Sequence, residues 1–121
     1  MFRVSVCYGL PADPESFDDY YTNFHTPMAL QIPGLAGFTT GKCRSLVPGK
    51  PPPYYIVASL IFETAEDLET ALNSAEMRAT NADLTYFASG GMTVFSHEEI
   101  GCRWPVPGAG PPELSHLRPT G

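Results

Sequence analysis

Hydrophobic and polar residues alternate along some parts of the chain and recur every three to four positions along others. Residues 2–8 alternate, with Val4 and Val6 on one face, and this period of two predicts a β-strand. Residues 54–62 are apolar at odd and even positions alike, except at Ser59. A strand of this kind is covered on both sides, so we expect it to be central in its sheet.

Two further strands have weaker patterns. Residues 35–44 include an aromatic and two β-branched side chains, although Gly37 and Gly41 indicate a bulge or a close backbone approach. Residues 92–96 form a short last strand. The proline-rich residues 45–53 are predicted to be the loop that joins the two middle strands.

Helical periodicity separates the first two strands. Asp13 followed by Pro14 predicts a helix start, because a carboxylate caps the first backbone N–H groups and proline is tolerated in the first turn. The sequence Ile-Pro-Gly at residues 32–34 ends this helix. At 100° per residue, one stripe of its surface faces the core. The stripe consists of Phe17, Tyr21, Phe24, Met28 and Ile32.

A second helical pattern lies between the last two strands. Thr64, followed three residues later by Asp67, predicts a helix start that is similar to a capping box. The pattern continues to Phe87, and Ser74 offers a second start within it. The two glycines at residues 90–91 end the helix.

The predicted elements follow in the order strand, helix, strand, strand, helix, strand. This order is typical of the ferredoxin-like split βαβ fold, an α+β architecture in which two helices cover one face of a four-stranded antiparallel sheet. Apolar side chains are nevertheless available on both faces of the sheet. In a chain of 121 residues, we expect the second face to pack against another copy related by a two-fold axis, which gives a homodimer.

Composition divides the chain into a folded part and a tail. The sequence has 13 prolines and 11 glycines, and many of the prolines lie in residues 48–53 or after residue 102. Residues 1–100 are therefore expected to form one domain, and residues 101–121 a proline- and glycine-rich C-terminal tail.

Charge and cysteine content exclude several classes of protein. The net charge is -6 and the seven Lys and Arg residues are scattered, so we expect no binding to nucleic acid. No apolar run is long enough for a membrane helix, and Arg3 and Ser5 interrupt what would be a signal peptide, so we expect a cytoplasmic protein that does not bind membranes. Cys7, Cys43 and Cys102 are far apart and form no C-x-x-C pair, which indicates reduced thiols.

His25 is the principal candidate for chemistry. It lies about 60° from the centre of the apolar stripe, so its side chain is directed between the helix and the sheet. Pro27 disfavours helical geometry at Thr26 and removes the hydrogen bond to the carbonyl of Asn23, so the backbone beside His25 is irregular. Histidine exchanges protons near neutral pH. The alternative is that His25 holds the kink by bonding to a freed carbonyl group.

Aromatic residues around His25 suit an apolar pocket with a few polar contacts. Tyr21 is the second candidate catalytic residue, and Asp18, two turns before His25, is a candidate to orient it or simply a solvated carboxylate. The candidate substrate-binding residues are Tyr8, Phe17, Tyr20, Phe24, Met28 and Tyr86.

Metal and cofactor sites have little support in the sequence. His97 is followed by Glu98 and Glu99, but one histidine at a strand end does not make a metal site, so we predict none. The glycine-rich and catalytic motifs of the large cofactor-binding classes do not occur, and we expect no cofactor.

Several segments together resemble the EthD family. That family is marked by a histidine, any residue and a proline on the first helix, which here is His25-Thr26-Pro27. Residues 13–21, residues 32–38 (Ile-Pro-Gly-Leu-Ala-Gly-Phe), the Pro-Tyr-Tyr at 53–55 and residues 82–93 also look like the family's pattern. The resemblance spans about residues 2–99.

The resemblance implies a dimeric α/β barrel, in which two ferredoxin-like subunits pack sheet against sheet. Related barrels include small cofactor-free monooxygenases, polyketide cyclases and lactone isomerases, which act on hydrophobic small molecules. It also implies a role for His25, since this is the histidine of the family's motif. Relatives are commonly described as oxidoreductases, but the sequence contains no recognisable nicotinamide or flavin site.

Three functions are therefore considered. The first is an enzyme, of oxidoreductase type or with cofactor-independent acid/base chemistry, that acts on a hydrophobic oxygenated compound with His25 as general acid or base and Tyr21 polarising a substrate oxygen. The second is a non-catalytic accessory protein that binds a hydrophobic metabolite for a partner oxygenase. The third is a haem- or flavin-binding barrel.

Overall fold

The computed structural model describes residues 1–101 and residue 108. The predicted tail, residues 101–121, and Cys102 with it, lies outside the described residues except for Gly101 and Gly108. No helix in the described part of the chain is long and apolar enough to cross a membrane. The elements are β1 (Phe2–Tyr8), α1 (Pro14–Tyr20), the π-helical turn η1 (Tyr21–His25), α2 (Thr26–Ala29), β2 (Gly37–Lys42), β3 (Ile56–Phe62), α3 (Ala65–Leu72), α4 (Ala75–Phe87) and β4 (Met92–Glu98).

The four strands form one antiparallel sheet in the order β2-β3-β1-β4. In its register, Val4 of β1 lies opposite Leu60 of β3 and Ser96 of β4, and Val6 lies opposite Ala58 and Val94. β3 lies between β2 and β1, so the prediction that the apolar strand is central is confirmed. The strands are close to their predicted ranges, and the ferredoxin-like fold class is confirmed.

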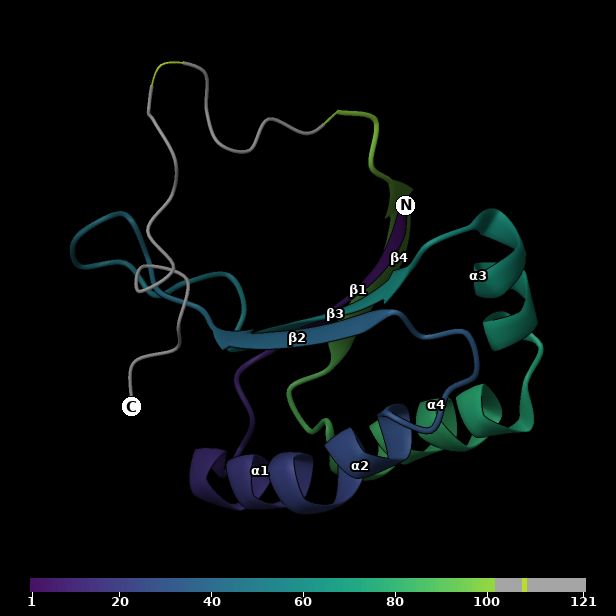
Figure 1. The fold of residues 1–121 in the computed structure, drawn as a ribbon. Coiled ribbons are helices and arrows are strands. Elements are labelled where there is room, and N and C mark those ends of the chain that lie inside the picture. The colour runs from purple at the N-terminus through teal and green to yellow at the C-terminus, as the bar shows by residue number, and fades with distance from the viewer. Residues whose placement is uncertain (102–107, 109–121) are drawn as a thin grey trace.

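The helices all lie on one side of the sheet, as Figure 1 shows. The even-numbered residues of β1 face them, and their side chains join those of the helices in one core. On the other face β1 presents Arg3, Ser5 and Cys7, and no helix of the described residues covers them. The buried apolar core consists of Val4, Val6, Tyr8, Phe17, Tyr21, Ala29, Ile32, Ile56, Ala58, Leu60, Phe62, Ala71, Met77 and Leu84.

Side-chain caps begin the helices where the sequence predicts them. Asp13 accepts a hydrogen bond from the backbone N–H of Ser16, and Thr64 accepts one from Asp67. Ser74 caps α4, so the second helical segment is two helices, α3 and α4, that are separated at this residue.

The first helical segment departs from a regular α-helix at η1. There the backbone N–H of Thr26 donates to the carbonyl of Tyr21, five residues earlier, which defines a π-helical turn. The predicted irregularity therefore exists, but it lies before Pro27 and widens the helix rather than simply bending it.

The wide turn changes which residues face the core. A π-turn contains more residues than an α-helical turn, so buried positions recur here at every fourth residue. They are Phe17, Tyr21, His25 and Ala29. The prediction that Phe24 belongs to the buried stripe is wrong, because its side chain is 58% exposed. His25, which was expected beside the stripe, is instead a buried member of it, with 4% of its surface exposed.

Candidate active site

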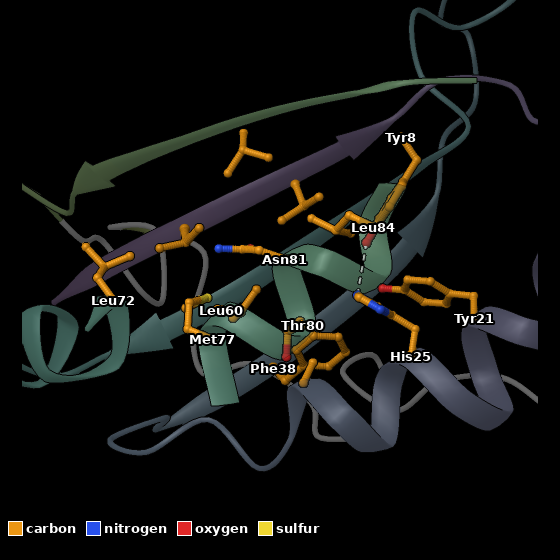
Figure 2. A pocket seen from close by; sticks show the side chains of 14 residues that line it. Tyr8, Tyr21, His25, Phe38, Leu60, Leu72, Met77, Thr80, Asn81 and Leu84 are labelled. Carbon is orange, nitrogen blue, oxygen red and sulfur yellow. Dashed lines mark hydrogen bonds between the residues drawn. The ribbon is translucent and has the colours of Figure 1, made fainter. Parts of the chain in front are cut away.

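A cavity of about 90 Å³ lies between the inner face of the sheet and helix α4 with η1 (Figure 2). Three of the residues that line it, Leu72, Asn81 and Val94, are exposed, so the cavity reaches the surface beside them. The described residues that line it are mostly apolar and include no Lys or Arg. They are Val4, Val6, Tyr8, Tyr21, His25, Ala29, Phe38, Leu60, Leu72, Met77, Thr80, Asn81, Leu84 and Val94.

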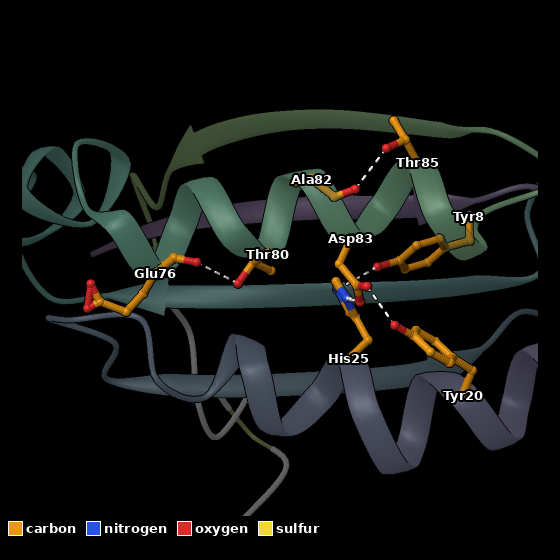
Figure 3. A network of polar contacts seen from close by, with 8 residues as sticks. All are labelled: Tyr8, Tyr20, His25, Glu76, Thr80, Ala82, Asp83 and Thr85. Carbon is orange, nitrogen blue, oxygen red and sulfur yellow. Dashed lines mark hydrogen bonds and ion pairs between the residues drawn. The ribbon is translucent and has the colours of Figure 1, made fainter.

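His25 is held at one end of this cavity by a carboxylate on another helix. Its Nδ1 lies 2.9 Å from Oδ2 of Asp83 in α4, and the hydroxyl of Tyr20 donates to Oδ1 of the same carboxylate at 2.6 Å (Figure 3). A carboxylate only accepts hydrogen bonds, so Nδ1 carries the imidazole proton. Nε2 is then an acceptor, and it lies 3.5 Å from the hydroxyl of Tyr8.

Burial makes the imidazole of His25 neutral at neutral pH. Desolvation lowers the pKa of His25 below its ordinary value, and the hydrogen bond and negative charge of Asp83 oppose this effect only in part. A neutral imidazole whose Nδ1 proton is held by a carboxylate has its lone pair on Nε2, which here has only the long contact with the Tyr8 hydroxyl. This arrangement can take up a proton from a bound molecule.

Two tyrosines lie beside His25 and are un-ionised. Burial raises the pKa of Tyr8, with further contributions from the nearby Tyr21 and Asp83. Burial also raises the pKa of Tyr21, and the neighbouring hydroxyls of Thr40 and Thr26 oppose this effect, although neither makes a hydrogen bond of full geometry with the Tyr21 hydroxyl. The rings of Tyr8 and Tyr21 meet edge to face with centroids 5.5 Å apart, and Tyr21 stacks on His25 at 5.7 Å. The Tyr21 phenol therefore has an unused donor.

The structure brings only some of the sequence-predicted residues to the cavity. His25, Tyr21 and Tyr8 line it together, and Figure 2 shows their side chains converging. Phe17 does not line it, since its ring is packed in the core against Tyr21 at a centroid distance of 5.7 Å. Met28 is half-buried and does not line it either.

Three further predicted residues lie on the outer side of the helices. Tyr20 is turned toward Asp83, Phe24 stacks on Tyr20 with centroids 5.2 Å apart, and Tyr86 lies 5.2 Å from Tyr20 and is 76% exposed. For Phe24 the reason is the π-turn, because the wide turn carries His25, and not Phe24, toward the sheet.

Asp18 does not orient His25. Its carboxylate accepts hydrogen bonds from the hydroxyl of Tyr55 at 2.9 and 3.0 Å and from Nζ of Lys42 at 2.7 Å. Nor does His25 bond to a freed carbonyl of its own helix, since its Nδ1 is engaged by Asp83. The sequence analysis did not identify Asp83. The available signals were its place in the helical pattern next to Leu84 and within residues 82–93, which resemble the family's pattern.

The described residues offer little to a metal ion. In residues 1–101, no three His, Cys, Asp or Glu side chains lie together in an arrangement that could bind one. His97 contacts Glu99 at 3.3 Å on the surface, and neither residue lines the cavity.

Known structures share this fold. The chain resembles an EthD family protein of Bacillus halodurans with a TM-score of 0.76 and 27% identity, over 83% of this chain and 99% of the other. It resembles SnoaB, a cofactor-independent oxygenase of Streptomyces nogalater, with a TM-score of 0.60 and 13% identity, over 84% and 94% of the two chains. It also resembles a dimeric ferredoxin-like protein of Thermobifida fusca, with a TM-score of 0.59 and 13% identity, over 81% and 90%. The last two likenesses concern the fold alone.

A protein known from its sequence has a higher identity to this chain than these structures have. An uncharacterised 11.0 kDa protein of Rhodococcus erythropolis, encoded in the thcB-thcC intergenic region, is 44% identical over 100 residues, which is 82% of this chain and 96% of that protein. The sequence profile of the EthD domain matches residues 10–91, a segment that runs from the end of β1 through η1 and α4. With its histidine on η1 and its ferredoxin-like sheet, the chain belongs to the EthD family.

Proposed function

We propose that the protein is an enzyme that moves a proton on a small, largely apolar and oxygenated compound, with His25 as the general base and acid. The observation that carries this proposal is the hydrogen-bonded pair of Asp83 and neutral His25 at an apolar cavity, where Nε2 of His25 faces the hydroxyl of Tyr8, another residue that lines the cavity. A buried, neutral and fixed imidazole is suited to proton transfer at neutral pH.

The proposed step is a proton transfer. Nε2 of His25 takes a proton from an O–H group, or from a C–H group beside a carbonyl, and the substrate keeps the electron pair as an oxyanion or enolate. Asp83 stabilises the imidazolium that forms. The proton then returns to another substrate atom, so the net reaction is an isomerisation or cyclisation. If molecular oxygen reacts with the anion instead, the same deprotonation begins an oxygenation, the activity that names SnoaB.

Tyr21 is proposed to hold the substrate oxygen. Its hydroxyl is buried and makes no hydrogen bond of full geometry among the described residues, where only the hydroxyls of Thr40 and Thr26 lie near it, and a buried donor that is left unpaired is costly. A substrate oxygen that accepts this hydrogen bond removes the cost and gains stabilisation as negative charge develops on it.

The cavity limits the class of substrate. Its lining among the described residues contains no cationic side chain, so the buried part of the substrate is uncharged. The volume of about 90 Å³ is smaller than the ~150 Å³ of a cavity that binds benzene. The part of the substrate near His25 is therefore compact, and any larger part extends to the surface beside Asn81.

The protein is proposed to act as a homodimer. The uncovered sheet face carries Val57, Ile61 and Phe95, and Phe95 is 50% exposed. A second copy would cover this face, and the ferredoxin-like protein of Thermobifida fusca is dimeric. Light scattering during gel filtration measures the mass and tests this part of the proposal.

His25→Gln tests the proton-transfer role. Glutamine keeps a hydrogen bond to Asp83 but takes up no proton, so turnover should fall at least about 100-fold. The measurement is the incorporation of solvent deuterium into a panel of small neutral ketones and phenols, followed by mass spectrometry. The matched control is His97→Gln, a change at an exposed histidine outside the cavity, which should leave exchange unaltered.

The same experiment separates the enzyme from an accessory binding protein. If the wild type binds panel compounds but exchanges no proton in any of them, and His25→Gln binds them equally well, the protein is a binder and His25 has no catalytic role. Exchange that persists in His25→Gln would assign the proton transfer to another group.

A further inference from the structure

Tyr20 lies outside the cavity, yet it makes the shorter of the two hydrogen bonds to the carboxylate that holds His25. Its hydroxyl is 2.6 Å from Oδ1 of Asp83, whereas Nδ1 of His25 is 2.9 Å from Oδ2. The side chains of His25 and Asp83 are only 4% and 10% exposed, so little water is available to replace either bond. Figure 3 shows Asp83 together with Tyr20 and His25, the two side chains that its carboxylate contacts.

We propose that Tyr20 is a positioning residue that acts on His25 through Asp83. The hydrogen bond from Tyr20 fixes the Asp83 carboxylate so that Oδ2 faces Nδ1 of His25. This keeps the imidazole in the tautomer that has its proton on Nδ1. The same hydrogen bond limits the basicity of Nε2. This inference rests on the proposed function of His25 as a base and extends it to the group that sets the tautomer and strength of that base.

The packing around Tyr20 makes it a fixed donor. Its ring lies 5.2 Å from Phe24, 5.2 Å from Tyr86 and 5.3 Å from Phe87, measured between centroids. The hydrogen bond to Asp83 raises the pKa of Tyr20 to about 12, so the phenol keeps its proton at neutral pH and remains a donor. Because one carboxylate oxygen is engaged in this way, the carboxylate is not free to rotate away from the imidazole.

Asp83 is the only carboxylate that faces His25 among the described residues that contact it. The other titratable groups are Tyr8 from β1 and Tyr21 from the preceding turn of the same helical segment, and both are neutral phenols at neutral pH. The charge of Asp83 therefore controls how strongly an imidazolium at His25 is stabilised. A hydrogen bond donated by Tyr20 draws part of this negative charge away from His25, so an imidazolium at His25 is stabilised less. Asp83 itself takes no proton in this scheme.

The test is Tyr20→Phe, studied by ¹⁵N NMR of the histidine side chains across a pH titration. In the wild type, the ¹⁵N shifts of His25 should show the proton on Nδ1. In Tyr20→Phe, the loss of the donor should raise the pKa of His25 by about half a pKa unit or more, and a second signal from the Nε2–H tautomer should appear.

Tyr86→Phe is the matched control. Tyr86 is the neighbouring phenol on the same surface, it makes no hydrogen bond to the described residues, and its removal should shift neither the pKa nor the tautomer of His25. A second variant keeps the shape of Tyr20: 3-fluorotyrosine at position 20 is a stronger donor, so it should lower the pKa of His25 rather than raise it.

Opposite shifts in the two Tyr20 variants, with none in Tyr86→Phe, would establish the positioning role. If neither variant moves the pKa or the tautomer of His25, or if Tyr86→Phe moves them equally, the inference is overturned and Tyr20 serves only to pack the helices. The NMR measurement needs no substrate, so its outcome is independent of whether His25 proves to be catalytic in the deuterium-exchange experiment.

Discussion

Two aspartates of this protein make the same kinds of bonds in different surroundings. Asp83 accepts hydrogen bonds from a tyrosine and from His25, and Asp18 accepts them from a tyrosine and from Lys42. The distances to the basic partners are similar, at 2.9 and 2.7 Å. The exposed fractions differ: 4% and 10% for His25 and Asp83, against 59% and 34% for Lys42 and Asp18.

The comparison shows that burial, and not bond length, separates a candidate site from a surface contact. At Lys42, the hydrogen bond to Asp18 raises the pKa of the ammonium group further above neutral pH, so this pair does not change its charge in the physiological range. At His25, burial lowers the pKa and leaves a neutral base. Water can replace the hydrogen bonds of Asp18 and Lys42. The buried groups of Asp83 and His25 have no such replacement, so each needs the other as its hydrogen-bond partner.

The largest expected difference between the pairs is in the effect of removing each carboxylate. Asp83→Ala leaves the buried Nδ1–H of His25 and the hydroxyl of Tyr20 without an acceptor, and should lower the free energy of unfolding by about 2–4 kcal/mol. Asp18→Ala is the matched control and should cost no more than about 1 kcal/mol, because Tyr55 and Lys42 can turn to water. Urea unfolding of the two variants and the wild type measures both values. Equal losses would contradict the distinction drawn from burial.

The next largest expected effect is a dependence of the free energy of unfolding on pH, to which only the buried pair of Asp83 and His25 should contribute. The pKa of His25 is lower in the folded chain than in the unfolded chain, where it is near 6.5, so the unfolded state binds the proton first as the pH falls. The contribution of neutral His25 to stability is complete above about pH 6.5 and is lost as the pH falls from there toward the folded-state pKa, with a slope of at most about 1.4 kcal/mol per pH unit.

Urea unfolding at pH 7.5 and pH 5.5 measures this loss. His25→Gln should remove the part of the slope that belongs to His25, whereas Lys42→Ala should leave it unchanged. A slope that is the same in the wild type and in His25→Gln would show that His25 keeps its ordinary pKa in the folded chain.

The smallest expected effect belongs to the exposed pair. Lys42→Ala should lower the free energy of unfolding only slightly, by less than Asp18→Ala or Asp83→Ala, and the difference from the wild type should shrink at high salt, where exposed charges are screened. The centroid of the Tyr55 ring lies 5.2 Å from Nζ, so part of the remaining loss is a cation–π contact. Unfolding experiments at two salt concentrations check this. A loss of several kcal/mol that salt does not reduce would place Lys42 in a structural role as important as that of Asp83.

The sequence was sufficient to predict the fold, because the fold depends on local signals. Alternation marks β1, and the caps at Asp13, Thr64 and Ser74 depend only on residues three positions away. His25 was found because of its place beside Pro27. These signals are short-range, so they do not depend on how the elements pack.

The partners of His25 could not be predicted in the same way. Asp83 is 58 positions from His25, and only the packing of α4 against η1 brings the two together. Asp18 looked suitable because it lies two turns earlier on the same helical segment, but Tyr55 and Lys42 engage it. The π-turn escaped prediction as well, because a regular 3.6-residue period places Phe24 rather than His25 toward the sheet.

The π-turn also contains one residue more than an α-helical turn would. The pattern of buried positions in α2 is therefore displaced by one residue relative to the pattern that α1 begins. An α-helix advances by about 100° per residue, so in a continuous α-helix the eight steps from Phe17 to His25 would rotate the imidazole by about 80° relative to Phe17, whereas the π-turn keeps both side chains toward the sheet. A relative with one residue fewer in this interval could form a continuous α-helix and still present its histidine to the sheet. The length of this segment is therefore as much a part of the site as the histidine itself. A chain of the same length without the π-turn would keep the histidine but turn it away from the sheet, whereas a chain with one residue fewer would present it without any π-turn.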